Sequence, residues 1–95
     1  MLLPIAMGTD AATPFNRHGE NAEELELMVA LGMTSVEAIA AASSVGARAL
    51  GRGDIGVLAA GKLADVVVWD GAPHEDVRVV QRAPRAVFLG GERIV

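Results

Sequence analysis

The 95-residue chain contains no cysteine, which excludes disulfides, thiol nucleophiles and zinc sites built on cysteine. Tyrosine is also absent, and aromatic residues make up only 3% of the sequence, so the stacking platforms that bind single-stranded nucleic acids are missing. The net charge is −4 and basic residues do not cluster, so no nucleic-acid partner is expected. No apolar run approaches the roughly 18–20 residues of a membrane span, so no membrane partner is expected either.

Apolar residues are abundant and make up 52% of the chain. A protein of this size buries only about 60–65% of its unfolded surface, so much of that apolar content must face outward. We therefore expect further protein to cover it, and we predict a homo-oligomer. The apolar start lacks a basic region and contains Pro4, so it is not expected to be a signal peptide. With no cysteine in the chain, the expected compartment is the cytoplasm.

The N-terminal part predicts a strand, a loop and a first helix. Residues 2–7 are a short apolar run that indicates a buried strand. Residues 8–20 are rich in turn formers and polar groups, and a loop of this length is often functional. Asn21 and Glu24 have the spacing of a capping box, which predicts a helix over residues 22–31.

A second helix follows directly. Gly32 is expected to end the first helix in the left-handed conformation. Thr34 and Glu37 then repeat the capping-box pattern, which predicts a helix over residues 35–50 that ends at Gly51. Its expected inner face consists of small and aliphatic residues: Val36, Ile39, Ala40, Ser43, Ala47 and Leu50.

The C-terminal part predicts β structure. Residues 57–59 indicate a short strand, and residues 65–70 form a β-branched run typical of a strand buried on both faces. Residues 77–80 fit either a strand or a single helical turn. Residues 85–95 predict a hairpin with a two-glycine turn.

These elements predict an α+β fold in which two antiparallel helices pack on a small, mainly antiparallel sheet of three to four strands. We expect one folded unit with two parts. Residues 1–52 hold the first strand, the loop and the helices, and residues 53–95 hold the β structure.

Residues 51–56 match the glycine spacing of a dinucleotide-binding turn. That motif needs a strand before it and a helix after it, so that the phosphate meets a helix N-terminus. Here a helix ends and a strand begins, so we interpret the glycines as a helix end followed by a turn. The Arg-Gly-Asp tripeptide inside this stretch is interpreted as a chance match.

The chain has two histidines, His18 and His74, which with Asp10 could suggest a metal cluster. A closed site takes three or four ligands, and these residues do not have helical metal-ligand spacing. His74 lies in a polar turn and is expected to be solvated. Asp10 follows an apolar strand, a place where carboxylates project into the cleft above a barrel. An Asx turn is the other interpretation of Asp10, and both remain open on the residues alone.

The order of segments resembles the C-terminal part of metal-dependent amidohydrolases. The specific matches are GTDAATPFNRHGENAEEL (residues 8–25) and GKLADVVVWDGAPHEDV (residues 61–77). The members that the chain is most similar to are imidazolonepropionase-like and Xaa-Pro dipeptidase-like (prolidase-type). The resemblance implies that residues 1–52 are the end of a TIM barrel and that residues 53–95 belong to a small β-sandwich.

The resemblance also implies roles for individual residues. Asp10 would end the last barrel strand, bind a divalent, zinc-like metal, and exchange a proton with the attacking water. Thr9 and His18 would contact a small-molecule substrate, and the reaction would be hydrolysis of an amide, dipeptide or cyclic amide C–N bond.

The family's other metal ligands, a His-x-His, a lysine and two later histidines, have no counterpart here. One carboxylate cannot hold a catalytic metal. We therefore expect the 95 residues to be part of a larger enzyme, inactive and without bound metal when isolated. The alternative function is a non-enzymatic α+β module that associates with itself.

Overall fold

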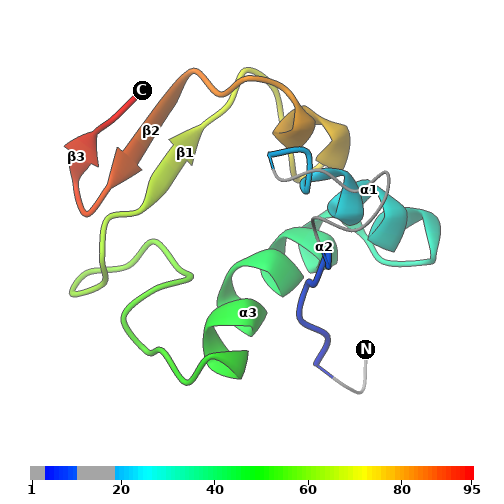
Figure 1. The fold of residues 1–95 in the computed structure, drawn as a ribbon, viewed down its shortest axis with the longest axis horizontal. Coiled ribbons are helices and arrows are strands. Elements are labelled where there is room, and N and C mark those ends of the chain that lie inside the picture. The colour runs from blue at the N-terminus through cyan, green and yellow to red at the C-terminus, as the bar shows by residue number, and fades with distance from the viewer. Residues whose placement is uncertain (1–3, 11–18) are drawn as a thin grey trace.

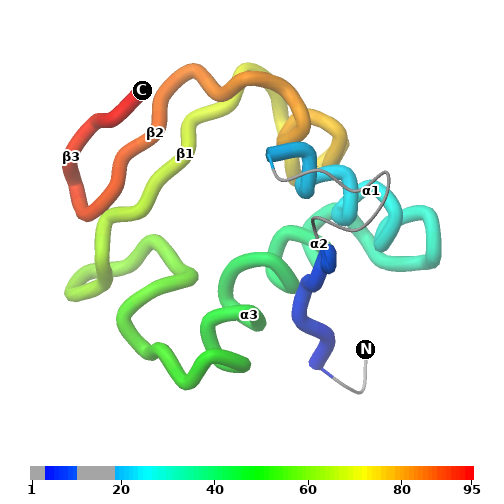
Figure 2. The backbone as a smooth tube through the Cα atoms, in the orientation of Figure 1, coloured from blue at the N-terminus to red at the C-terminus, as the bar shows by residue number. Residues whose placement is uncertain are grey.

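The computed structural model describes residues 4–10 and 19–95 as a ring of helices and strands (Figures 1 and 2). In chain order the elements are α1 (Glu23–Ala30), α2 (Ser35–Ala42), α3 (Ser44–Ala49), β1 (Val66–Val68), the 3₁₀ helix η1 (Val77–Gln81), β2 (Ala86–Leu89) and β3 (Glu92–Arg93). The strands form one antiparallel sheet in the order β1-β2-β3. The predicted combination of helices with a small antiparallel sheet is confirmed.

The core lies where α1, α2 and η1 meet. Its buried members are Leu25 and Met28 of α1, Ala38 and Ala41 of α2, and Val77 of η1. The prediction that the helices pack on the sheet is therefore wrong, because they pack on η1 and on each other. Figure 1 shows the sheet across the ring from α1 and α2.

The first helix begins differently from the prediction. Ala22 is the N-cap and no side chain caps the helix, so the predicted Asn21–Glu24 capping box is wrong. The backbone supplies the reason. The N–H groups of Glu23 and Glu24 donate to the carbonyl oxygens of Glu20 and Asn21 over 3.3 and 3.1 Å, so these donors need no side-chain acceptor.

The second capping box is confirmed. The Glu37 N–H donates to Thr34 Oγ1 over 3.1 Å, and the Thr34 N–H donates to Glu37 Oε1 over 2.9 Å. These bonds hold the pKa of Glu37 below its ordinary value, because the backbone N–H favours the charged carboxylate. Gly32 has the predicted positive φ, at 119°.

The predicted helix over residues 35–50 is interrupted at Ser43. The Ser43 backbone leaves the helical region, with φ −121° and ψ −90°, and its hydroxyl donates to the carbonyl oxygen of Ile39 over 2.7 Å. A serine hydroxyl that competes for helix carbonyls commonly distorts a helix. The predicted inner face is correct for buried Ala47, but Val36 and Leu50 are exposed. The predicted end at Gly51, with φ 71°, is confirmed.

Two predicted strands do not form. Residues 57–59 have no strand pairing, and neither do residues 4–7, the described part of the predicted strand over residues 2–7. A strand needs a neighbouring strand to satisfy its backbone groups. In the described part of the chain, Met7 instead donates its N–H to the carbonyl oxygen of Ala41 in α2, over 3.0 Å.

The valine run becomes β1, which is shorter and more exposed than predicted. Val67 is 44% exposed and Val68 is 38% exposed, so burial of this strand on both faces is wrong for this chain. The predicted hairpin is confirmed, with Leu89 of β2 opposite Glu92 of β3. The two turn glycines have positive φ values of 59° and 87°, as a two-residue hairpin turn requires.

The open alternative at residues 77–80 is settled as the 3₁₀ helix η1. Asp76 is its N-cap, and its carboxylate accepts hydrogen bonds from the Arg78 N–H (3.1 Å) and the Arg78 guanidinium (2.8–2.9 Å). These contacts lower the pKa of Asp76 to about 2, and the hydrogen bonds from the Arg78 guanidinium have the largest effect.

Asp76 is expected to make the fold sensitive to acid. Its folded pKa is depressed, so its contribution to stability is present above about pH 4 and is lost as the pH falls through about 2. We expect the urea midpoint of the wild type to exceed that of Asp76→Asn at pH 5, and the two to converge near pH 2. Urea titrations followed by circular dichroism measure this. A difference that stays constant from pH 5 to pH 2 would contradict the assignment.

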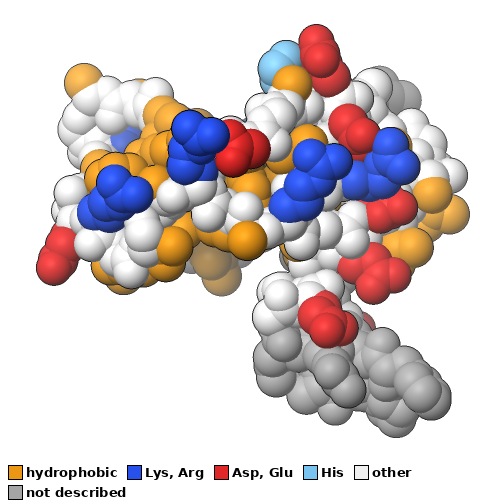
Figure 3. Space-filling model, turned by 90° about the horizontal axis from the view of Figure 1, so that it is seen from above, with side chains coloured by type: hydrophobic (Ala, Val, Ile, Leu, Met, Phe, Trp, Pro, Cys, Tyr) orange, Lys and Arg blue, Asp and Glu red, His pale blue; other side chains and the backbone are white. Residues whose placement is uncertain are grey.

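Figure 3 shows charged side chains of both signs on both halves of this face, and apolar side chains that reach the surface between them. Among residues 4–10 and 19–95, no helix is long and apolar enough to cross a bilayer.

Candidate functional site

Asp10 ends the described N-terminal segment, residues 4–10, which runs beside α2 and α3 (Figure 1). The hydrogen bond from Met7 to Ala41 fixes this segment on α2, three residues before Asp10. The Asp10 side chain is exposed, so it is accessible to water and to small molecules. Asp10 therefore follows an apolar segment, as expected, although that segment lies on a helix and is not paired as a strand.

The backbone at Asp10 is in the left-handed region, with φ 51°. Asp10 is the sole non-glycine residue with positive φ in the described part of the chain. Aspartate adopts this conformation more readily than most residues, but it remains uncommon. Positions of this kind concentrate at functional sites. The conformation turns the chain sharply, directly after Thr9.

Thr9 is half-buried and lines a cavity of about 910 Å³. The cavity lies between residues 6–9, the α2–α3 region, residues 55–58 and β1. Its walls are mainly apolar and include Ile39, Ala47, Leu50, Val57, Leu58 and Val67. Thr9 lines this cavity, whereas the Asp10 carboxylate, one residue further along the chain, is not among its lining groups. A mainly apolar cavity with a few polar groups at its wall is typical of small-molecule sites.

Of the two histidines, His74 lies among the described residues and does not line the cavity. His18 lies outside the described residues, so its predicted substrate contact is untested. His74 is exposed in the turn before η1, where its ring nitrogen lies 3.9 Å from the carboxylate of the adjacent Glu75. The prediction that His74 is solvated is confirmed.

Asp10 does not form a metal site with other described residues. No group of three or more His, Cys, Asp or Glu side chains that could hold a metal ion occurs among residues 4–10 and 19–95. A catalytic metal generally needs at least three protein ligands. The described donor set therefore does not fit a complete metal centre.

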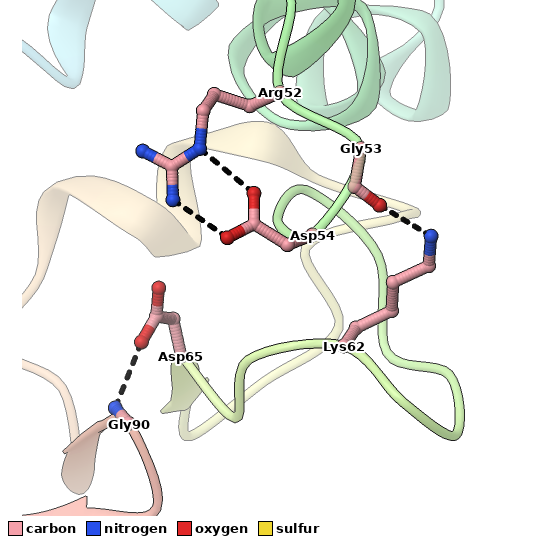
Figure 4. A network of polar contacts seen from close by, with 6 residues as sticks. All are labelled: Arg52, Gly53, Asp54, Lys62, Asp65 and Gly90. Atoms are coloured by element: carbon pink, nitrogen blue, oxygen red, sulfur yellow. Dashed lines mark hydrogen bonds and ion pairs between the residues drawn. The ribbon is translucent and has the colours of Figure 1, made fainter.

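The glycine-rich stretch over residues 51–56 forms turns after α3, as predicted (Figure 4), and the next element of the described chain is the strand β1. The Arg52 guanidinium donates two hydrogen bonds of 2.7 Å to the Asp54 carboxylate, which lowers the pKa of Asp54. The charged pair of the Arg-Gly-Asp tripeptide is thus engaged internally. Lys62 Nζ donates to the carbonyl oxygen of Gly53, and the Asp65 carboxylate accepts from the Gly90 N–H over 2.8 Å.

Two polar residues of the cavity wall are absent from the predicted site. The sequence pattern assigns Asn21 to a helix cap and Ser43 to a helix face, yet both line the cavity. Ser43 lies at the helix interruption, and no sequence pattern marks the position of that interruption.

The family profile described as Amidohydrolase family matches residues 3–94, almost the whole chain. The chain belongs to the amidohydrolase family. Two curated amidohydrolase relatives share about two-fifths of the aligned residues. Imidazolonepropionase from Pyrobaculum arsenaticum is 39% identical over 69 residues, which is 72% of this chain and 17% of the relative. Adenine deaminase 2 from Agrobacterium fabrum is 38% identical over 68 residues, which is 72% of this chain and 11% of the relative.

Solved structures agree with this amidohydrolase assignment. A Xaa-Pro dipeptidase with methionine in its active site superposes with a TM-score of 0.87 at 35% identity, covering 95% of this chain and 22% of its own. A Bifidobacterium longum protein assigned as a prolidase superposes with a TM-score of 0.90 at 36% identity. The match covers 97% of this chain and 23% of that protein. The chain thus matches about a fifth of each solved structure. The resemblance to imidazolonepropionase-like and prolidase-like members is confirmed.

Proposed function

We propose that this chain supplies one segment of a metal-dependent amidohydrolase that hydrolyses C–N bonds, with Asp10 as the proton-carrying carboxylate. The superposition on a Xaa-Pro dipeptidase over 95% of this chain carries the proposal. The names of the relatives support the bond class, since dipeptide hydrolysis and adenine deamination both break a C–N bond. Membership of an enzyme family disfavours the alternative of a non-enzymatic module.

The same comparisons support a proposal for the architecture. Residues 1–52 would form the end of a TIM barrel, with residues 4–10 as its last strand and the helices outside it. The contact of Met7 with α2 supports this, because barrel strands pack against the helices that follow them. Residues 53–95, which hold all three strands, would form part of a small β-sandwich.

The proposed chemistry of Asp10 is proton transfer. Its carboxylate would accept a proton from the water that attacks the substrate carbon, and the new C–O bond would form as that proton leaves. Asp10 would then donate the proton to the departing nitrogen as the C–N bond breaks, which returns the carboxylate to its starting state. Thr9, at the cavity wall, and His18 would contact the substrate.

A divalent metal, which amidohydrolases generally use, would need ligands beyond the described residues, with Asp10 as one of the set. We propose a small molecule as the substrate, because the relatives named above act on dipeptides and on a nucleobase. The proposed compartment is the cytoplasm, on the cysteine-free composition.

A segment exchange tests the proposed function. Residues 1–95 would replace the matching segment of the Xaa-Pro dipeptidase, and hydrolysis of a Xaa-Pro dipeptide would be measured with and without a chelator. We expect chelator-sensitive activity within about 100-fold of the parent enzyme, because misplacing catalytic groups by about 1 Å costs that factor. A matched exchange with a shuffled 95-residue segment is the control. A folded exchange enzyme, checked by circular dichroism, that is no more active than the shuffled control would refute the proposal.

A further inference from the structure

Helix α2 ends at Ala42, so its last carbonyl groups need hydrogen-bond partners from outside the helix. Ser43 supplies two of these partners. Its hydroxyl donates to the carbonyl oxygen of Ile39 over 2.7 Å, and its N–H donates to that of Ala40 over 3.1 Å. In a continuous helix the Ser43 N–H would itself donate to Ile39. The hydroxyl occupies that acceptor and so ends the helix.

The carbonyl oxygen of Ala41, at the same helix end, accepts the Met7 N–H over 3.0 Å. Ala41 is only 1% exposed, and a buried carbonyl group needs a partner because leaving it unpaired costs stability. The end of α2 therefore holds the N-terminal segment, which runs beside it (Figure 1). The Met7 side chain packs against the core and adds a second anchor. Three residues span at most roughly 11 Å, so an anchor at Met7 keeps Asp10 close to α2.

Gly46 of α3 leaves room for the Ala41 carbonyl group. A Cβ atom on Gly46 would lie 3.3 Å from the Ala41 oxygen, close enough to push that oxygen by a few tenths of an ångström. Gly46 does not have the positive φ that favours glycine, and alanine is the better helix former. The backbone of α3 alone therefore gives no reason for a glycine here, whereas the nearby Ala41 oxygen does.

We propose that Ser43 is a positioning residue for Asp10. By ending α2, Ser43 directs the Ala41 carbonyl oxygen at the Met7 N–H, and this bond holds the segment that leads to the site. Ser43 also lines the cavity beside Thr9, so it joins the helix end to the candidate site. The consequence for hydrolysis rests on the proposed function of Asp10, whereas the coupling of Ser43 to Met7 does not.

Amide hydrogen exchange of the Met7 N–H, measured by NMR on the 95-residue chain, tests this coupling without hydrolysis. Ser43→Ala removes the hydroxyl, so the helix continues and the Ala41 carbonyl turns from Met7 to the helix axis. We expect protection of the Met7 amide to fall about tenfold, the factor that one ordinary hydrogen bond represents. The amide of Ala38, which donates to Thr34 over 2.9 Å within α2, is the internal reference and should keep its protection.

The conservative variant Ser43→Thr should keep Met7 protection within about threefold of the wild type, because a threonine hydroxyl makes the same bond to the residue four before it. Ser44→Ala is the matched control. It removes a hydroxyl one position further along, and that side chain supplies none of the three bonds at the end of α2. Its Met7 protection should stay within about twofold.

Gly46→Ala separates the coupling from helix stability. Alanine favours the helix, so the urea midpoint should stay the same or rise. The displaced Ala41 oxygen should nevertheless lower Met7 protection by more than about threefold. A role of Gly46 in helix stability alone would not produce this combination.

Three outcomes of the exchange measurement would overturn the proposal. The first is unchanged Met7 protection in Ser43→Ala. The second is an equal loss at Met7 and Ala38, which would mean that Ser43 only stabilises the helices. The third is a loss in Ser44→Ala as large as that in Ser43→Ala.

The segment-exchange enzyme tests the consequence for hydrolysis. Ser43→Ala should lower kcat by about 10- to 100-fold, because a shift of about 1 Å in a reacting group costs up to the larger factor. Ser43→Thr should keep kcat within about threefold. An unchanged kcat beside lowered Met7 protection would overturn the positioning of Asp10. An inactive exchange enzyme, with amides of the 95-residue chain that respond as expected, would instead refute the proposed function and support the coupling of Ser43 to Met7.

Discussion

Asp10→Asn in the segment-exchange enzyme is expected to lower the rate of dipeptide hydrolysis by at least about 100-fold, the usual contribution of a positioned general acid–base group. Asparagine keeps the size of the side chain but cannot take a proton from the attacking water. Asparagine also adopts positive φ as readily as aspartate, so the φ of 51° at this position is retained. The loss should therefore appear in kcat with an unchanged melting temperature.

Glu75→Gln is the matched control for this prediction. It removes one exposed carboxylate in the same chemical way, at a turn that does not border the cavity. We expect its activity to stay within a factor of about two of the exchanged enzyme, because exposed positions away from the site contribute little. An Asp10→Asn enzyme that keeps more than half of the activity would show that Asp10 does not carry the proton.

The parts of the fold that the sequence predicts well are the ones whose signals are local. The Thr34–Glu37 capping box closes within four residues, and the two-glycine hairpin turn closes within two. No distant partner is needed for either element, so the pattern alone determines them. Gly51 ends α3 for the same reason.

The parts that the sequence predicts poorly depend on partners far along the chain. The segment before Asp10 and residues 57–59 have strand-like composition, yet neither pairs with another strand in the described part of the chain. Burial of the valine run depends on which neighbouring segment covers β1. The valine-rich composition does not identify that segment.

The candidate site likewise has features that the sequence indicates and features that only the folded chain brings together. The position of Asp10 after an apolar segment indicates a functional carboxylate only weakly, since an Asx turn explains it equally well. The resemblance to amidohydrolases is what singles out Asp10 and Thr9, and the structure adds the positive φ of Asp10 and the cavity beside Thr9. That cavity is assembled from five separate segments of the chain, so no single sequence motif could predict it.

Gly56→Ala is expected to reduce the free energy of unfolding by about 2–4 kcal/mol, from overpacking and a left-handed backbone together. Gly56 lies where the turn after α3 crosses the interruption between α2 and α3. A Cβ atom there would lie 2.8 Å from the Ala47 Cβ and 2.9 Å from the Ser43 carbonyl oxygen. Both neighbours belong to the helix backbone or lie next to it, so neither can move aside at low cost. The φ of 91° adds strain for any residue with a Cβ.

Substitutions at two further glycines separate the cost of overpacking from the cost of the left-handed backbone. Gly61 has φ 83°, but a Cβ atom added there would have no neighbour within 4 Å, so Gly61→Ala measures the backbone cost alone, about 1 kcal/mol. Gly53 has neither positive φ nor a close neighbour, so Gly53→Ala should change stability by less than about 0.5 kcal/mol. Urea unfolding of the three variants should therefore rank them Gly56, Gly61, Gly53 in order of decreasing loss. Equal losses at Gly56 and Gly61 would mean that the turn does not press on the Ser43 interruption. The α2–α3 break would then be a property of Ser43 itself, independent of the segment that crosses it.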